Sequence, residues 1–258
     1  MNIGLLVLLG AAIGAILGAL GGGGAILTVP ALVYLVHQSP QNATTGSLII
    51  VGATALTAVI SHAHAGNVRW RIGLSFALAG VGGAIGGTAL NHLVPGHVLI
   101  LSCAGLLLIC GALMLRRKRT TEQPPENLAD RPMSTRALTR TLSAGLVVGF
   151  LTGFLGVGGG FVIVPALVVA VGLPMNSAVG TSLLIIAANC ATSLAARTGI
   201  SHIDWKIILP FAISAMVAAL AGRRIASALP QRAVTHAFAA LVLAVAGYMA
   251  VHTLAFAA

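Results

Sequence analysis

The sequence predicts an all-α integral membrane protein built from two homologous repeats, most simply inverted ones. Of its 258 residues, 58% are hydrophobic and only 7% are charged, whereas soluble domains carry about 25% charged residues. A helix crosses the bilayer with about 17 to 25 apolar residues, and several such runs occur, for example 73–90, 98–115 and 233–254. The short alternating segments of a membrane β-barrel do not occur in the sequence.

Each half divides into five apolar segments, of which the second is short. The expected segments are 3–20, 25–37, 43–65, 72–90 and 97–115, then 138–155, 160–172, 176–196, 206–222 and 233–254. A helix of about 13 residues is roughly 20 Å long, which is short for a membrane span, so we expect the second segments to be re-entrant or broken. The N-terminus lacks the positive charge of a cleavable signal peptide, so we expect segment 3–20 to be retained as a membrane helix.

A glycine-rich break followed by a proline occurs twice. Gly21-Gly22-Gly23-Gly24 leads to Pro30, and Gly156-Val157-Gly158-Gly159-Gly160 leads to Pro165, with 135 positions between the two copies. The same 135 positions separate three further pairs, namely Trp70 and Trp205, Gly87 and Gly222, and Pro95 and Pro230. The chain is therefore predicted to be a tandem repeat, with membrane repeats at 1–115 and 138–258 and a linker at 116–137.

Half of the cations lie in one polar stretch. Between residues 116 and 140 stand seven of the 14 Lys and Arg residues: Arg116, Arg117, Lys118, Arg119, Arg131, Arg136 and Arg140. Such clusters mark the cytoplasmic side of a membrane, so we expect a cytoplasmic linker and regard nucleic-acid binding as excluded. Arg69 and Arg71 then lie inside, and Arg223, Arg224 and Arg232 lie inside only if the second half is inverted. Arg197 and Lys206 would fall outside, which counts against inversion; merging the first two segments of each half would give parallel repeats instead.

The acidic residues constrain the substrate. Outside the linker the chain has one acidic residue, Asp204, beside Trp205. Cation transporters and proton pumps usually place Asp or Glu at membrane depth, so the missing carboxylates favour a neutral or anionic substrate.

The two breaks are the expected binding site. New helices are predicted from Ala25 and Phe161, and the free N–H groups and positive dipole at a helix start favour an anion. Paired, glycine-interrupted short segments are also the best sequence indication of a transporter's binding site. By contrast, Gly10, Gly14, Gly18, Gly82, Gly83, Gly86 and Gly87 are predicted mainly to allow close helix packing.

A second paired motif follows each break. Asn42 precedes Gly46-Ser47, and Asn176 precedes Gly180-Thr181-Ser182. Asn is a favoured N-cap, so the motif predicts a helix start, and the hydroxyl groups one turn later could also donate to a ligand. The predicted substrate-binding residues are Gly21, Gly22, Gly23, Gly24, Asn42, Gly46, Ser47, Gly156, Gly158, Gly159, Gly160, Asn176, Gly180, Thr181 and Ser182.

Other polar residues have a weaker functional signal. His62 and His64 lack the further ligands that a zinc site requires, so an interfacial position near a loop is expected; proton coupling is the alternative, because histidine titrates near neutrality. Thr54, Thr57, Asn189, Thr192 and Ser193 either line a pathway or form interhelical hydrogen bonds. Arg197 either attracts anions or extends to the lipid headgroups.

These motifs resemble the TauE/SafE family of sulfite exporters over nearly the whole chain. The resemblance rests on the glycine runs leading to Val29-Pro30-Ala31-Leu32 and Val164-Pro165-Ala166-Leu167, on the two Asn-x-x-x-Gly-[Ser/Thr] starts, and on the tryptophan loops. It implies a multi-pass permease of the bacterial inner membrane that exports sulfite, sulfoacetate or related anions. Val157 interrupts the second glycine run, and Ala178 and Val179 replace Thr44 and Thr45, so the two half-sites are expected to contribute unequally.

The leading hypothesis is a secondary transporter that binds a small anion between the halves and works by alternating access. An anion channel is the alternative, and an intramembrane enzyme is disfavoured because the sequence offers no catalytic pair or metal set at membrane depth. The expected partners are the small anion and the lipid bilayer, with a homodimer left open and no cofactor or metal expected.

Overall fold

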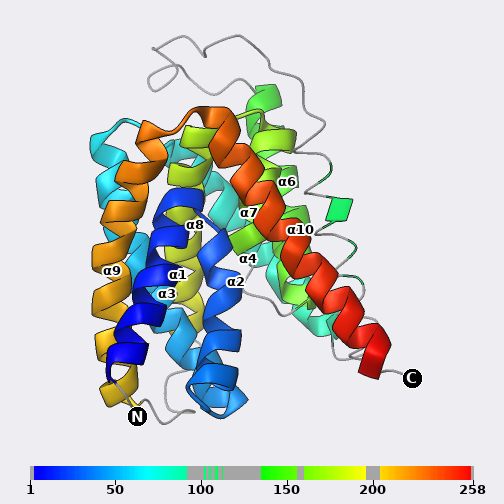
Figure 1. Cartoon of the computed structure of the whole chain (residues 1–258). Coiled ribbons are helices and arrows are strands. Elements are labelled where there is room, and N and C mark those ends of the chain that lie inside the picture. Colours follow the sequence, from blue (N-terminus) through cyan, green and yellow to red (C-terminus); the bar gives the residue numbers. More distant parts are fainter. Residues whose placement is uncertain are drawn as a thin grey trace.

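Every secondary-structure element of the described chain is a helix. The structure is a computed structural model that describes residues 3–91, 102, 105, 108–109, 112, 135–155, 160–195 and 204–256. The elements are α1 (Ile3–Leu20), α2 (Gly23–Pro30), η1 (Ala31–Leu35), α3 (Pro40–His64), α4 (Trp70–Asn91), α6 (Thr135–Leu155), α7 (Gly160–Ala166), η2 (Leu167–Val171), α8 (Met175–Ala195), α9 (Trp205–Ala228) and α10 (Gln231–Phe256) (Figure 1). Four helices in this part are long and apolar enough to cross a membrane: α1, most of α3, α8 and α9. The predicted all-α membrane class is confirmed.

The helices follow the predicted apolar segments, with extensions at their polar ends. The helix α9 continues to Ala228, beyond the predicted end at 222, and α6 begins at Thr135, inside the predicted linker 116–137. Arg136 and Arg140 are therefore helical rather than part of a loop. An apolar run identifies only the part of a helix that crosses hydrocarbon, whereas the helix itself can continue into the polar interface. The rest of the linker and most of segment 97–115 lie outside the described residues.

Both short segments are broken helices, as predicted. The helix α2 has 8 residues and is followed by η1, a π-helix of 5; α7 has 7 residues and is followed by η2, a π-helix of 5. Pro30 ends α2 and Pro165 lies next to the end of α7. Proline has no amide hydrogen and its ring clashes with the carbonyl four residues earlier, so the regular hydrogen-bond pattern changes at the same place in both segments.

The first helix of each half packs against the fourth helix of the other half, α1 against α9 and α6 against α4, and glycines lie at both contacts. A Cβ atom at Gly10, Gly14 or Gly18 of α1 would collide with Ser214 Oγ or with carbonyl oxygens of α9. Likewise, a Cβ at Gly83 or Gly87 of α4 would collide with carbonyl oxygens of α6. The packing prediction is confirmed for these five glycines. It is wrong for Gly82, whose added Cβ would have no atom within 4 Å, because the helix turns this position away from α6.

The contacts also fix the direction of each helix. Gly10, Gly14 and Gly18 meet Phe211, Ala215 and Ala219 in the same order, so α1 and α9 are parallel. Gly46 meets Ile208 and Ser61 meets Arg223, so α3 is parallel to α9 as well. Phe76 and Gly80 of α4 meet Gly145 and Gly149 of α6 in the same order, so α4 and α6 are parallel. Arg69 and Gly73 meet Thr181 and Leu184 of α8 in the same order, so α8 is parallel to α4 as well. Gly52 lies against Cys190 while Asn67, beyond the end of α3, lies against Gly180 near the start of α8, so the two groups of helices are antiparallel.

The protein therefore consists of two bundles that exchange one helix. The first bundle contains α1, α2 with η1, α3 and α9, and one buried cluster joins it through residues such as Leu6, Leu32, Ile50 and Phe211. The second contains α6, α7 with η2, α8 and α4, whose buried residues belong to a larger cluster that also includes α10. Figure 1 shows α9 beside α1 and α3, and α10 crossing the molecule diagonally.

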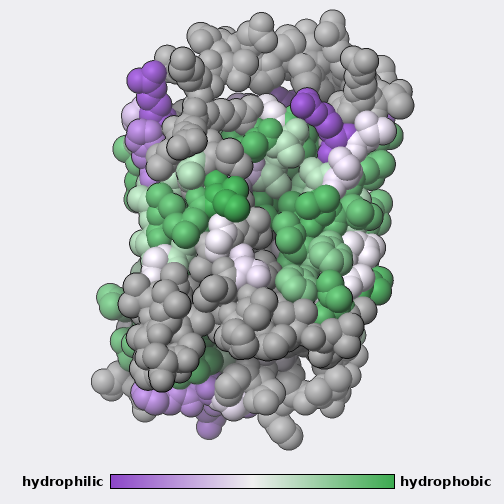
Figure 2. Space-filling view, turned by 90° about the vertical axis from the view of Figure 1, so that its right-hand side faces the viewer, coloured by the Kyte–Doolittle hydropathy of each residue, from purple (hydrophilic) through white to green (hydrophobic). Residues whose placement is uncertain are grey.

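The outer surface is apolar around the middle of the molecule. Figure 2 shows hydrophobic residues in a band between hydrophilic groups near the two ends. Leu78 and Ile85 of α4 and Val217 of α9, for example, are exposed by 75%, 70% and 65%. A belt of exposed aliphatic side chains is stable in lipid and costly in water, as a membrane protein requires.

Candidate functional site

The first glycine break is a sharp backbone reversal between α1 and α2. Gly21 adopts φ +79°, a left-handed conformation that glycine reaches without steric cost. Its N–H donates to Leu17 O and that of Gly22 donates to Leu20 O, which closes α1. The helix α2 then starts at Gly23, with Gly22 as its N-cap and no side-chain cap. The first N–H groups of a helix have no intrahelical acceptor, so this end is open to an external one.

The first break lies against the paired motif of the second half. A Cβ atom at Gly21 would stand 2.6 Å from Ser182 Oγ, 3.2 Å from Val179 Cα and 3.2 Å from Val164 Cγ2. Ser182 and Val179 belong to α8, and Val164 belongs to α7. The predicted binding residues Gly21 and Ser182, which are distant in sequence, are thus brought together across the two bundles.

The second break meets the first at Gly160. A Cβ atom there would lie 3.2 Å from Ala25 Cβ, 3.2 Å from Ile186 Cδ1 and 3.3 Å from Gly22 O. The starts of α2 and α7 are therefore neighbours. Both helices begin close to where the glycine runs predict, at Gly23 and Gly160 rather than at Ala25 and Phe161. The other glycines of the second run, Gly156, Gly158 and Gly159, lie outside the described residues.

The two asparagines do not cap their helices as predicted. In α3 the N-cap is Ser39, whose Oγ accepts a hydrogen bond of 3.4 Å from Asn42 N, and Pro40 follows at the start of the helix. In α8 the helix begins at Met175, before Asn176, which is exposed. Proline is favoured in the first turn because it has no N–H to leave unpaired, and Ser is as good a cap as Asn. Asn42 and Asn176 thus stand at helix starts, away from the Gly21 and Gly160 contacts described above.

The hydroxyl groups of the motif already have partners. Ser47 Oγ donates to Thr44 O at 2.8 Å, and Ser182 Oγ donates to Val179 O at 2.8 Å. Thr181, fully buried, accepts a hydrogen bond of 3.1 Å from the backbone N–H of Arg69. Gly46 packs against Ile208 and Leu32. Of the predicted hydroxyls, Ser182 is the one that contacts a described glycine of the breaks.

The residues suggested as pathway-lining are mostly bonded within their own helices. Thr54, Thr57 and Thr192 each donate to the carbonyl four residues earlier, at 2.6, 3.0 and 3.1 Å. Thr54 is buried and Thr192 is exposed. This local bonding is common for threonine in helices and favours neither of the two predicted roles. Arg197 lies outside the described residues.

Two basic residues, Arg223 and His62, lie beside the first break, and nothing in the sequence indicates that they come together there. Arg223 of α9 donates hydrogen bonds from Nη1 to the carbonyl oxygen of Ser61 and to Ser61 Oγ, the latter at 2.8 Å. Next to Ser61, His62 is only 5% exposed, and its Nε2 lies 3.2 Å from Gly18 O of α1. His62 is therefore buried between helices near the end of α3, whereas His64 is exposed, and the expected interfacial position stays a prediction. Helical periodicity explains the difference, because residues two apart on a helix face different directions.

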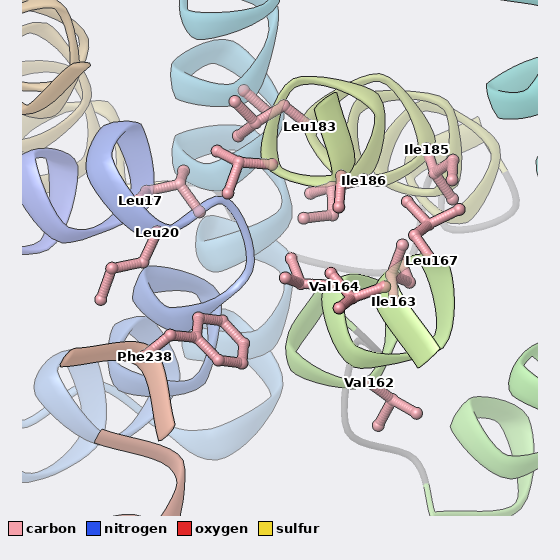
Figure 3. Packing of buried hydrophobic residues seen from close by; sticks show 14 of the residues in the cluster. Leu17, Leu20, Val162, Ile163, Val164, Leu167, Leu183, Ile185, Ile186 and Phe238 are labelled. Atoms are coloured by element: carbon pink, nitrogen blue, oxygen red, sulfur yellow. The ribbon is translucent and has the colours of Figure 1, made fainter. Parts of the chain in front are cut away.

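Aliphatic side chains close the region between the two bundles. Figure 3 shows Leu17 and Leu20 of α1 on one side, Val164 of α7 and Ile186 of α8 on the other, and Phe238 of α10 beside Leu20. All five are buried by at least nine-tenths. The breaks are thus enclosed by apolar packing, in which an unpaired charge would be costly and a few oriented N–H groups would have a large effect.

Comparison with known proteins agrees with this architecture. The model of the sulfite exporter TauE/SafE family matches residues 6–249, which include both breaks and both paired motifs. The chain belongs to the TauE/SafE family. The predicted resemblance is therefore confirmed, and TauE/SafE membership places the protein among multi-pass membrane transporters.

Curated relatives have the same general description. A probable membrane transporter protein of Xylella fastidiosa strain 9a5c is 33% identical over 93% of this chain and 92% of its own length. The probable membrane transporter protein YdhB of Bacillus subtilis is 28% identical over 88% of this chain and 91% of its own. A further probable membrane transporter protein, from Methanocaldococcus jannaschii, is 26% identical over 70% of this chain and 67% of its own.

Proposed function

We propose that this protein is a secondary transporter that exports small sulfur-containing anions, such as sulfite or sulfoacetate, across the bacterial inner membrane. The anion binds where the starts of α2 and α7 meet. The observation that carries the proposal is the contact between the two breaks, where the Cβ position of Gly160 lies 3.3 Å from Gly22 O. Two helix starts then lie next to each other, and each brings a positive dipole end and first-turn N–H groups that have no acceptor in the regular α-helical pattern.

The electrostatics of the described residues support an anion rather than a cation. Asp204 is the one carboxylate among them, and it caps the start of α9 by accepting from Lys206 N, at the opposite end of that helix from Arg223. His62 and Arg223 lie beside the first break. A cation in this enclosed region would have no negative partner, whereas an oxyanion would meet N–H donors and a guanidinium group.

Inverted repeats are the simplest relation between the halves. The helices α1 and α3 run parallel, their counterparts α6 and α8 run in the opposite direction, and the fourth helices α4 and α9 are antiparallel in the same sense. Parallel repeats would give counterparts the same direction. An inverted pair also brings two equivalent breaks together from opposite sides, as in many transporters with a central site.

Alternating access would then occur between bundles rather than between sequence halves. Each fourth helix is fixed by glycine contacts to the first helix of the other half, so neither half can move as one body without separating these contacts. The two bundles can then move against each other where α3 contacts α8 and where α2 contacts α7, and the breaks lie at these contacts. Rocking of α1, α2, α3 and α9 against α4, α6, α7 and α8 would expose the anion to either side in turn.

The basic residues support a cytoplasmic linker. Because Arg223 bonds to Ser61, the ends of α3 and α9 share one face of the molecule, together with Arg69 and Arg71 at the start of α4. Since α4 and α6 are parallel, the start of α6, where the linker ends, lies on that face as well. Lys206 lies at the opposite end. Basic residues gathered on one face support a cytoplasmic position for that face under the positive-inside rule.

The decisive experiment is counterflow in proteoliposomes. Vesicles loaded with unlabelled sulfite or sulfoacetate should take up the labelled anion from a dilute external solution, with saturation, whereas vesicles without protein should not. Leucine in place of Gly23 or Gly158 should abolish this uptake while the protein remains in the membrane. Large single-channel currents would instead identify an anion channel, and no uptake of either anion would refute the proposed substrates.

A substrate panel on purified protein complements the flux assay. Binding to the folded state raises the unfolding temperature, and the stabilisation grows with the logarithm of one plus the ratio of ligand concentration to Kd. Sulfite or sulfoacetate should therefore stabilise the protein more than sulfate, thiosulfate or simple carboxylates at equal concentration. Equal stabilisation by all anions would indicate non-specific ionic binding.

A further inference from the structure

His62 is a buried titratable side chain with an unused polar atom. It lies near the end of α3 and is 5% exposed. Its Nε2 is hydrogen-bonded to Gly18 O at 3.2 Å. Its Nδ1 is also buried and, among the described residues, has no hydrogen-bond partner. Buried polar atoms without a partner are uncommon, because each costs about 1–3 kcal/mol of desolvation.

The partner of Nε2 determines what Nδ1 can do. A carbonyl oxygen only accepts hydrogen bonds, so Nε2 carries the hydrogen and donates to Gly18 O. In the neutral imidazole, Nδ1 is then a bare acceptor without a donor. After uptake of a proton, it becomes an N–H donor that requires an acceptor. The unpaired atom is therefore suited to bind a proton together with a negatively charged group.

The ring lies next to the proposed anion site. Gly18 is one turn before Gly21, which begins the first break. On the other side, a Cβ atom at Gly180 would lie 3.3 Å from His62 Cβ, and Gly180 is two residues before Ser182, whose hydroxyl contacts Gly21. His62 is thus enclosed by α1 and α8 at the point where these helices meet the first break.

Among the described residues, the charged groups around the ring provide no negative counter-ion for its proton. From α9, Arg223 is close enough for its charge to act on His62. The helix α1 has no titratable residue, α8 has only Cys190, which lies against Gly52, and the loop after α3 contributes Arg69. On α3 itself, His64 is exposed and its Nδ1 is paired with Ile60 O at 2.7 Å. None of these groups is a carboxylate.

We propose that His62 couples proton and anion transport: Nδ1 takes up one proton when an oxyanion binds at the first break, and both are released to the same side. Export by this route is driven by an outward gradient of the anion that exceeds the opposing proton gradient. The N–H bond at Nδ1 forms as one O–H bond of a hydronium ion from the solution breaks, which leaves a water molecule. This inference rests on the proposed function. Without an anion, the proton would place a second positive charge beside Arg223 in an apolar enclosure; with an anion, the two positive groups and the negative ligand stabilise one another. By thermodynamic linkage, proton and anion each raise the affinity for the other.

The test uses the full-length protein in proteoliposomes, with the membrane voltage held at zero and with labelled sulfite and sulfoacetate as probes. Protein-free liposomes measure leakage. An inward gradient of one pH unit should drive about tenfold accumulation of the anion if one proton accompanies it. The variant His62→Gln retains a donor for Gly18 O but cannot take up a proton. It should show counterflow and no accumulation above the external concentration. The control His64→Gln should accumulate the anion as the wild type does.

The outcomes separate this inference from the proposed function. If the wild type shows no counterflow with either probe, the proposed function fails and the coupling fails with it. If the wild type shows counterflow but its accumulation ignores the pH gradient, only the coupling is refuted. Accumulation by His62→Gln equal to that of the wild type refutes it too. Loss of counterflow as well as accumulation in His62→Gln assigns the residue a structural or anion-binding role instead of coupling.

Discussion

The two glycine breaks occupy matching places in the fold but have different surroundings. Beside the first, His62 is buried against α1, and Arg223 is hydrogen-bonded to Ser61. Near the second, one turn along α7 from Gly160, a cavity of about 10 Å³ is lined by Thr152 and Asn189 together with apolar side chains of α4, α6, α7 and α8. Such a volume is about enough for one water molecule. Among the described residues, the surroundings of the first break therefore include a positive charge, and those of the second are neutral and polar.

The repeat offset shows that this difference lies in the sequence. The position 135 residues before Arg223 is Thr88, and the position 135 residues before Thr152 is Leu17. Leu17 is fully buried in the apolar core. The second half therefore has a charged residue where the first half has threonine, and a polar residue where the first half has leucine. We infer that the fold supplies two equivalent helix starts whose surrounding side chains have different roles. Those at the first break neutralise the charge of the anion, and those at the second form neutral hydrogen bonds with it.

The largest expected effect comes from alanine at the two breaks. Gly21→Ala combines a positive φ with a Cβ atom 2.6 Å from Ser182 Oγ, whereas Gly160→Ala brings a Cβ no closer than 3.2 Å to its neighbours. Gly21→Ala should lower counterflow at least about tenfold, corresponding to about 1.4 kcal/mol or more of strain, and Gly160→Ala should lower it less. Gly4→Ala, whose Cβ has no atom within 4 Å, is the control. A larger loss for Gly160→Ala would contradict the stated difference.

Removal of the charge near the first break should have an intermediate effect. Arg223→Gln keeps a donor for Ser61 but removes the positive charge, so the apparent affinity for sulfite should fall by about three- to tenfold, in line with about 1 kcal/mol for a partly solvated charge interaction. The difference should decrease at high salt because screening weakens the interaction in the wild type. Thermal shift and counterflow titrations both measure this affinity.

Arg224→Gln is the matched control for that experiment. Arg224 is the next residue of α9 and is exposed, so it carries the same charge without the contact to Ser61. An equal loss of affinity in both variants would mean that the overall charge of this face, rather than the position of Arg223, attracts the anion.

Much of the fold could be predicted from the sequence because membrane helices have local sequence signals. The segments 3–20 and 176–196 correspond closely to α1 and α8, and the first glycine run lies at the break between α1 and α2. A helix in lipid needs an apolar run of defined length, and clustered glycines followed by proline destabilise a continuous helix. Both signals depend only on neighbours in the chain, so one sequence is enough to find them.

The exchange of the fourth helices and the burial of His62 could not be predicted in the same way. Both depend on which helix packs against which, and the glycine faces of α1 and α4 fit any partner with small residues or an accessible backbone. His62 and His64 are the same residue type near the end of the same helix, and only the packing of α1 and α8 against His62 distinguishes them. The opposite directions of corresponding helices, which support inversion, likewise follow from contacts between distant segments.

The smallest expected effect concerns the neutral side chains near the second break. Asn189→Leu keeps the approximate volume but removes the amide, so it should weaken the apparent affinity for sulfite by about two- to fivefold, the equivalent of one modest hydrogen bond. The anion accumulation produced by a pH gradient should not change, because His62 lies at the other break. Thr192→Val is the control, since Thr192 is exposed and bonds within α8. Altered accumulation in Asn189→Leu would mean that the second break also takes part in coupling, and the division of work between the breaks would have to be abandoned.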